Sequence, residues 1–314
     1  MTRHLTVLLE EVVKVLTEGE WSNRKRIIVD CTLGGGGHSE AILMSDSSAY
    51  VVGFDRDQQA LHRATERLKQ FKDRFTGVCA PFSQISSELA KLDWSNNYPV
   101  AGIIADLGIS SDQLDDAERG FSFSNEGPLD MRMNKNQVLS AASVLNTYEA
   151  HELKKVFFVG GMRKGVTQLV KEILTRRPFE TTRDFADVCV KVLSRFERQG
   201  KKNPATVPFQ ALRIEVNKEF VELESLLEQG LEVLSPGGRL AVISFHSLED
   251  KIVANTMRGW ARKESLGRRA PGELAPERGS LLTKKAIVPT EKEILSNSRS
   301  RSARLRVFEK SFIQ

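Results

Sequence analysis

The sequence predicts an α/β fold in which helices cover a parallel sheet, and two observations carry this prediction. Short runs of β-branched residues alternate with amphipathic helical patterns through roughly the first hundred residues, as in strand–helix–strand units. The run Arg26–Cys31 is also of the fully buried strand type, which is typical of parallel strands covered on both faces. Strands are expected at 26–31, 50–55, 75–80, 100–106, 239–245 and 303–310.

Helical spacing of apolar residues predicts the elements between these strands. Helices are expected at 5–16, 38–44 and 56–71, as several helices within 140–194, and as one long helix at 210–234. The last of these should stop at Ser235-Pro236-Gly237-Gly238, a strong breaker. Residues 259–289 are basic and punctuated by proline and glycine, so we expect mostly loop there.

The strand–helix rhythm breaks after Asp106, and about a hundred residues of helix and loop patterns precede the next strand. A chain of 314 residues is long enough for two domains. We therefore expect an inserted helical domain at 113–208, between a first part of the core at 1–112 and a second part at 209–314.

Positive charge is concentrated at the C-terminal end. Residues 251–314 hold 15 Lys and Arg against 6 Asp and Glu, although the net charge of the whole chain is only +5. Such an excess favours a polyanion such as a phosphate backbone, with a solvated surface tail as the alternative interpretation. The longest apolar runs have strand length and the N-terminus lacks a secretion signal, so we expect a cytoplasmic protein with no membrane partner.

The three cysteines, Cys31, Cys79 and Cys189, are widely spaced and form no C-x-x-C pair. Neither a disulfide framework nor a metal site is therefore expected.

A glycine run marks the expected ligand site. The first strand leads directly into Gly34-Gly35-Gly36-Gly37, where a parallel strand meets a helix N-terminus. Glycine there lets main-chain N–H groups approach a nucleotide-type cofactor at the carboxyl end of the sheet. Asp55 closes the second strand 18 residues after Gly37, a place suited to holding ribose hydroxyls.

Both nicotinamide dinucleotides and S-adenosylmethionine carry adenosine, so these features alone leave both open. The third glycine of the dinucleotide pattern falls on Ser39, which weakens pyrophosphate binding. The fourth strand ends in Asp106-Leu107-Gly108, where a methyltransferase needs polar groups beside the methyl donor. The details favour S-adenosylmethionine, and a nicotinamide-dependent oxidoreductase is the less favoured alternative.

Several blocks of sequence, in order over nearly the whole chain, resemble the RsmH (MraW) family of bacterial methyltransferases that act on N4 of a decoding-site cytosine in 16S ribosomal RNA. The blocks are Gly36-Gly37-His38-Ser39, Asp106-Leu107-Gly108-Ile109-Ser110-Ser111, Ser244-Phe245-His246-Ser247-Leu248-Glu249-Asp250, and residues 4–11, 55–57, 113–115, 118–123, 127–133 and 209–217.

The resemblance implies a Rossmann-like S-adenosylmethionine-dependent core interrupted by a helical RNA-recognition domain. Its RNA partner would be 16S ribosomal RNA within the small ribosomal subunit, and a homodimer is left open. Carried over by motif, the cofactor contacts would be Gly36, Gly37, His38, Asp55, Phe82, Asp106 and Gln113.

Methylation of an exocyclic amine needs hydrogen-bond acceptors on its N–H bonds, because the nitrogen lone pair is shared with the ring. Asp106 is the first candidate acceptor, and Ser244 and His246 at the end of the fifth strand follow. Structural roles remain open for others: Phe82 as core, Gln113 as a loop cap, and His38 and His246 as side chains satisfied by backbone.

Two segments depart from the family pattern. Gly160-Gly161-Met162-Arg163 lacks two carboxylates that the family has, and Asn203-Pro204-Ala205-Thr206-Val207 replaces His-Pro-Ala-Thr-Arg. Both lie in or beside the insertion, so the expected cofactor site is untouched while the exact RNA target is put in doubt. A ribosome-assembly protein that keeps the fold without catalysis is the alternative function.

Overall fold

The structure is a computed structural model, and it describes residues 6–92, 97–196, 203–262, 264–265, 274–275 and 277–312. The chain forms two compact units. The first comprises Met1–Gly108 and Glu222–Gln314, and the second comprises Ile109–Val221. The expected boundary at 208/209 falls inside a helix of the second unit.

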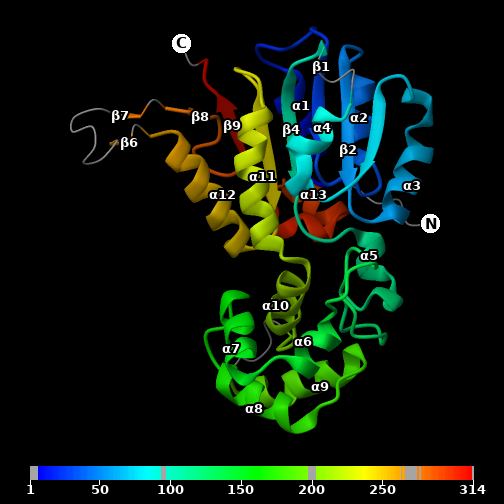
Figure 1. The fold of residues 1–314 in the computed structure, drawn as a ribbon, viewed down its shortest axis with the longest axis vertical. Helices are drawn as coiled ribbons and strands as arrows, with labels where there is room; N and C mark the ends of the chain where they lie inside the picture. The colour runs from blue at the N-terminus through cyan, green and yellow to red at the C-terminus, as the bar shows by residue number, and fades with distance from the viewer. Residues whose placement is uncertain are drawn as a thin grey trace. The chain divides into compact units, whose positions relative to one another are not determined.

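A seven-stranded sheet in the order β3-β2-β1-β4-β5-β9-β8 forms the centre of the first unit (Figure 1). The first five strands of the chain pair in parallel, whereas β9 is antiparallel to both β5 and β8. The order 3-2-1-4-5 is that of a doubly wound, Rossmann-like sheet. The strands are β1 (Arg26–Asp30), β2 (Ala49–Asp55), β3 (Phe75–Cys79), β4 (Val100–Asp106), β5 (Arg239–Ser244), β8 (Gly279–Leu281) and β9 (Arg304–Lys310).

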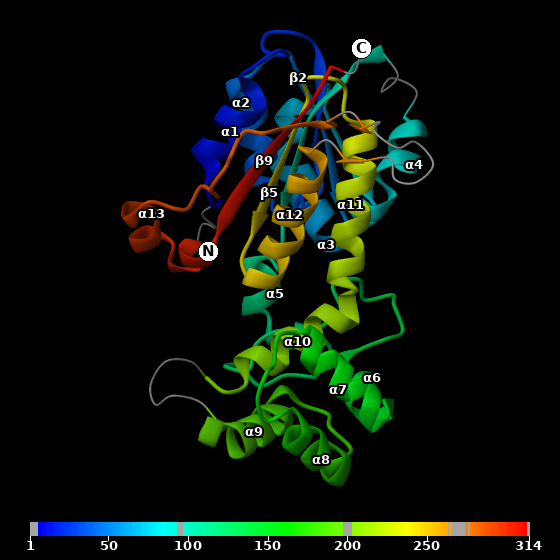
Figure 2. The ribbon, with the colours of Figure 1, turned by 90° about the vertical axis from the view of Figure 1, so that its left-hand side faces the viewer.

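Helices bury both faces of this sheet (Figure 2). Side chains alternate between the two faces of a strand, so Ile28 packs with α1, α2 and α3, while Ile27 and Val29 pack with α4, α11 and α12. The helices of this unit are α1 (Leu9–Thr17), α2 (Gly37–Ser45), α3 (Gln58–Arg67), α4 (Ile85–Ala90), α11 (Glu219–Val233, from Glu222 onward), α12 (Ser247–Trp260) and α13 (Glu291–Ser296).

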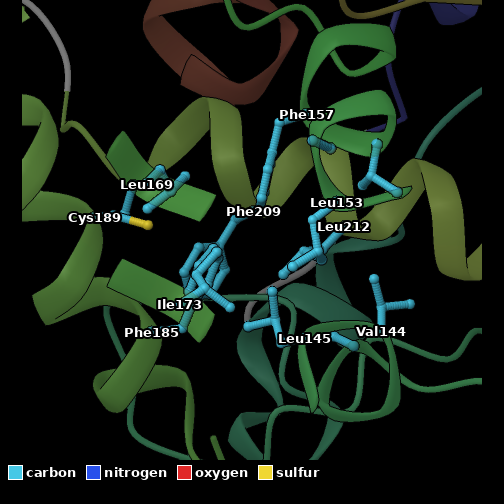
Figure 3. Close-up of a cluster of buried hydrophobic side chains, with 14 of the residues drawn as sticks. Val144, Leu145, Leu153, Phe157, Leu169, Ile173, Phe185, Cys189, Phe209 and Leu212 are labelled. Atoms are coloured by element: carbon cyan, nitrogen blue, oxygen red, sulfur yellow. The ribbon is translucent and has the colours of Figure 1, made fainter. Parts of the chain in front are cut away.

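The second unit is helical and has its own apolar core (Figure 3). Met131 and Met133 are buried in this core. Aromatic rings form the middle of this core: Phe185 stacks on Phe209 with ring centroids 5.4 Å apart, and Phe179 meets Phe185 edge-on at 6.0 Å. The helices are α5 (Ser111–Asp115), α6 (Ala141–Thr147), α7 (Ala150–Val159), α8 (Val166–Arg176), α9 (Thr182–Leu193) and α10 (Thr206–Asn217).

The prediction of a single long helix at 210–234 is wrong, because α10 ends at Asn217 and α11 begins at Glu219. Lys218 between them has a left-handed backbone with φ of +52°. The corner is held by Arg213, which donates from Nε to Glu219 at 2.7 Å, and by Asn217, which donates to the carbonyl of Met131 at 2.8 Å. Apolar spacing continues through the break and no glycine marks it, so the sequence pattern concealed the corner.

The segment at 259–289, expected to be mostly loop, contains more helix and strand than predicted. Helix α12 continues to Trp260, and β8 adds an edge strand beside β9. Two residues each from β6 (Glu264–Ser265) and β7 (Leu274–Ala275) also pair. Over the residues with described structure, no helix combines the length and apolar character that a bilayer crossing needs.

Replacing Phe185 by alanine is expected to destabilise the second unit by about 3–5 kcal/mol, because the ring is fully buried among other rings and its loss leaves a cavity. Denaturant unfolding of the full chain measures the loss. Val190→Ala on the same helix, where the side chain is 42% exposed, is the control and should change stability by less than about 0.5 kcal/mol. Equal effects of the two changes would contradict the packing described here.

Candidate functional site

Four polar residues end the parallel strands at one edge of the sheet. Asp30, Asp55, Asp106 and Ser244 are the last residues of β1, β2, β4 and β5. Because these strands are parallel, their carboxyl ends share an edge, and the order of the sheet reverses between β1 and β4. Open α/β sheets bind ligands at this switch point, so the edge is the candidate functional site.

The glycine turn between β1 and α2 has the backbone that its sequence predicts. Gly34 and Gly36 adopt positive φ values of +49° and +76°, which side chains rarely tolerate. A Cβ on Gly37 would lie 2.0 Å from Thr6 Oγ1, whereas a Cβ on Gly35 would meet nothing within 4 Å. The turn is therefore fixed by conformation and packing at three glycines, and it leaves open space at the fourth.

Asp55 holds this turn to the end of β2. Its Oδ2 accepts a hydrogen bond from the N–H of Gly34 at 2.9 Å, and its Oδ1 accepts from the N–H of Asp57 at 2.8 Å. Burial raises the pKa of the Asp55 carboxyl, while these hydrogen bonds oppose the rise. Each carboxylate oxygen keeps a further lone pair, so Asp55 can support the turn and still accept from a ligand hydroxyl.

Asp30 is a site residue that the sequence analysis missed. Its Oδ2 accepts from the hydroxyl of Ser39 at 2.6 Å, and its Oδ1 accepts from the N–H of Thr32 at 3.2 Å. Burial raises the pKa of Asp30 to about 6, and the charge of Asp55 adds to the rise. The available signal was its position, since a carboxylate ending an apolar strand is the feature that singled out Asp55 and Asp106.

Asp106 is the most perturbed carboxyl group of the site. Its backbone N–H donates to Thr32 Oγ1 at 2.6 Å, but its Oδ1 is buried with no hydrogen-bond partner within the described chain. Burial, together with the charges of Asp30 and Glu249, raises the pKa of Asp106 to about 8. An unsatisfied buried oxygen costs about 1–3 kcal/mol, so a donor or a cation placed there would be stabilised.

Ser244 and His246 lie where β5 meets α12. Ser244 is buried, and His246 is the N-cap of α12, with its Nδ1 accepting from the N–H of Glu249 at 3.4 Å. In return, Glu249 Oε2 accepts from the N–H of Phe245 at 3.0 Å. His246 therefore has a capping role in the structure, beside which its expected catalytic role stays a prediction.

The other expected contacts also have structural partners. His38 Nε2 lies 3.0 Å from the carbonyl oxygen of Val7, and Phe82 is buried in the core with the guanidinium of Arg56 5.8 Å from its ring centroid. Gln113 belongs to the second unit, where its Oε1 accepts from the N–H of Ser110 at 3.2 Å and caps α5. The remaining expected residues all lie in the first unit, at or directly after the carboxyl ends of its strands.

A doubly wound sheet, an open glycine turn and carboxylates at the switch point define the class: a Rossmann-like α/β protein with a candidate ligand site at the carboxyl ends of its strands. The model of the MraW methylase family matches residues 1–311, and the chain belongs to this family, as the sequence resemblance indicated.

Curated relatives agree with this assignment. A protein from Picosynechococcus sp. named ribosomal RNA small subunit methyltransferase H is 42% identical, over 98% of this chain and 96% of its own length. Proteins of the same name from Carboxydothermus hydrogenoformans and Synechococcus elongatus are 41% and 38% identical. Each alignment covers 98% of this chain, and 97% and 94% of those relatives.

Replacing Asp106 by asparagine is expected to raise the melting temperature, and the gain should grow with pH. The folded pKa of about 8 lies above the ordinary value of 3.8, so ionisation of this carboxyl destabilises the folded state. The penalty is absent below about pH 4, increases through neutrality and is complete above about pH 8. The asparagine side chain has nearly the same shape as the aspartate side chain, but it carries no charge at any of these pH values.

Thermal unfolding of the variant and the unmodified protein at pH 5, 7 and 9 measures this effect. Asp73→Asn, at an exposed carboxyl of the same unit, is the matched control and should shift the melting temperature equally at each pH. A gain for Asp106→Asn that does not change with pH would contradict the burial of this carboxyl.

Proposed function

We propose that this protein transfers the methyl group of S-adenosylmethionine to N4 of a cytosine in the decoding region of 16S ribosomal RNA. Membership of the MraW methylase family supports methyl transfer, and the names of the relatives support ribosomal RNA of the small subunit as the substrate. The observation that carries the proposal is the set of buried carboxylates around the glycine turn, whose most perturbed member is Asp106.

The residues present fit the proposed cofactor. It is a cation carrying an adenosine, and the site offers open space at Gly35, an oxygen of Asp106 without a partner, and three carboxylates near one another. We assign Asp55 to the ribose hydroxyls of the cofactor, and Gly36, Gly37 and His38 of the adjoining turn to the same bound molecule. Phe82 and Gln113 complete the proposed set of cofactor contacts. We propose that the ring of Phe82 packs on the adenine face and that the Gln113 amide makes a polar contact with the cofactor.

The bound cofactor would supply a methyl group already activated on a positively charged sulfur. The protein must then position the acceptor nitrogen and exclude water. The exocyclic amine of cytosine is a poor nucleophile, so an acceptor on its N–H bonds is needed to support developing positive charge. Asp106 is the proposed first acceptor, with Ser244 and His246 next to it along the sheet edge.

The raised pKa of Asp106 bears directly on this role. A protonated carboxyl has one accepting oxygen and one O–H donor, whereas the carboxylate has two accepting oxygens. A positive charge beside Asp106 favours the carboxylate, because opposite charges lower the pKa of an acid. With a pKa of about 8, the Asp106 carboxyl favours its protonated form at neutral pH, and a positively charged methyl donor bound beside it would favour the carboxylate.

The target base must leave its pair and stack before its amine can react. We assign RNA recognition to the helical second unit, and phosphate contacts to the basic C-terminal region. Ten cations of that region are exposed in the described structure: Lys251, Arg258, Arg262, Arg278, Lys284, Lys285, Lys292, Arg299, Arg301 and Arg304. Such cations favour a phosphate backbone. The proposed substrate is the RNA within the small ribosomal subunit.

Incubation of the purified protein with methyl-labelled S-adenosylmethionine and small ribosomal subunits tests the function. Label is expected on N4 of one cytosine, located by nuclease digestion and mass analysis. Asp106→Ala should lower kcat by about a hundredfold or more, because an acceptor at the reacting amine is lost. An assembly protein without catalysis would leave the RNA unlabelled, and near-normal turnover of the variant would remove Asp106 from the mechanism.

Proton release on cofactor binding tests the ionisation of Asp106. Calorimetry at pH 7, in buffers that differ in ionisation enthalpy, should show protons released when S-adenosylmethionine binds, since the pKa of this carboxyl falls from about 8. S-adenosylhomocysteine has no positive sulfur and should release fewer protons. Asp106→Asn should abolish the difference between the two ligands; an unchanged difference would assign the proton to another group.

A further inference from the structure

One outward surface of the second unit combines an exposed aromatic ring with cations. We call it the α7 surface: His151, Lys154, Lys155, Phe158 and Arg163. Positions 151, 154, 155 and 158 are spaced three, four and seven residues apart, so they share one side of α7. Phe158 is 60% exposed, which is unusual for so large an apolar side chain.

Packing on the inner side of α7 keeps Phe158 outside. Leu153 and the neighbouring Phe157 are fully buried in the core of the unit, as Figure 3 shows. At the end of the helix, a Cβ on Gly160 would lie 2.2 Å from the Cβ of Ala211 on α10, so the helix end packs closely there. Rotating α7 to bury Phe158 would therefore expose Phe157 and Leu153.

Arg163 covers part of the exposed ring in a fixed position. Its guanidinium carbon lies 4.7 Å from the ring centroid of Phe158, and its Nη1 donates to the carbonyl oxygens of Phe158 at 2.9 Å and Met162 at 3.1 Å. A guanidinium held over a ring is a flat, cationic platform. Nucleic-acid bases stack on both arginine planes and phenylalanine rings.

Positive charges lie close to Phe158 in the sequence and flank it on both sides. Residues 153–164 contain four cations, Lys154, Lys155, Arg163 and Lys164, and no carboxylate, and all four are exposed. Within the described chain neither Lys154 nor Lys155 forms an ion pair. Cations that flank an exposed ring complement a strand whose phosphates are negative and whose bases are free to stack.

We propose that the α7 surface binds a single-stranded segment of RNA, with one base stacked on Phe158 and Arg163 and the flanking phosphates held by Lys154, Lys155 and Lys164. The inference rests on the proposed function in taking RNA as the partner, and it goes further in naming the surface, the single-stranded form and the stacking mode. Double-stranded RNA offers phosphates but no free base face, so it should bind this surface more weakly.

Fluorescence anisotropy with a short, unstructured, labelled oligoribonucleotide and the full chain tests the proposal. Phe158→Ala should weaken binding by about tenfold, the usual loss for one stacked base, without changing the salt dependence. The double change Lys154→Ala with Lys155→Ala should instead reduce the slope of log affinity against log salt by about 1.4, because two phosphate contacts are lost. Phe158→Trp should restore binding.

Met44→Ala is the control, since this apolar side chain is 71% exposed on α2 of the first unit and belongs to no surface assigned to RNA. It should leave oligonucleotide affinity unchanged. Melting temperatures of all variants verify folding, and exposure of each replaced side chain means that little change is expected. Wild-type affinity in Phe158→Ala, or equal competition by duplex and single-stranded RNA, overturns the proposal.

Methyl-transfer kinetics separate this inference from the proposed function. With small subunits as substrate, Phe158→Ala should raise KM for the RNA and leave kcat unchanged. If the unmodified protein is active and Phe158→Ala changes neither KM nor oligonucleotide affinity, RNA binding by the α7 surface is refuted and the proposed function stands. Oligonucleotide binding that depends on Phe158, in a protein that transfers no methyl group, refutes the proposed function and leaves the surface standing.

Discussion

The buried hydrogen bonds of Asp30 and Thr32 are the constraint on which the candidate site depends. Asp30 accepts from Ser39 in α2 and from the backbone of Thr32, and the hydroxyl of Thr32 in turn accepts from the N–H of Asp106 at the end of β4. These contacts join the two strands on either side of the switch point to the helix that follows the glycine turn. The network leaves Oδ1 of Asp106 without a hydrogen-bond partner in the described chain. The groups that hold the two strands and the helix together therefore also leave one oxygen able to accept from a ligand.

The sheet and the carboxyl edge could be predicted because their signals are local. An apolar run that ends in Asp55 or Asp106 predicts a strand, and the carboxylate predicts where the candidate site lies. Parallel pairing then brings the ends of these strands together. The break at Lys218 could not be predicted, since a lysine carries no signal for a left-handed backbone. It depends on ion pairing of Arg213 with Glu219, which only the folded corner creates.

Side-chain roles were harder to predict than positions. Phe157 is fully buried and Phe158 is 60% exposed, because helical spacing groups Phe157 with Leu153 on the inner side of α7. That distinction needs the bounds of α7, and the sequence pattern predicts only several helices within 140–194. His246 was singled out as a candidate for chemistry, and the structure additionally makes it a helix cap. Caps need the exact start of a helix, which sequence patterns place only approximately.

The departures from the family pattern have a physical account in the second unit. The first glycine of the Gly160 segment is retained where close packing against Ala211 leaves no room for a side chain. Met162 stands where the family has a carboxylate, and it is 5% exposed within the apolar core. Val207, which stands where the family has an arginine, is partly buried against the same core. The changes at Met162 and Val207 therefore place apolar side chains against the core of the unit.

The outer strand β8 covers part of β9 at one edge of the sheet. Strand β9 spans seven residues, and without a neighbour its row of backbone N–H and C=O groups would be a template for pairing with another chain. Strand β8 covers part of that row with only three residues of its own. So short an outer strand offers little for a second molecule to extend, which limits pairing with another chain at this edge of the sheet.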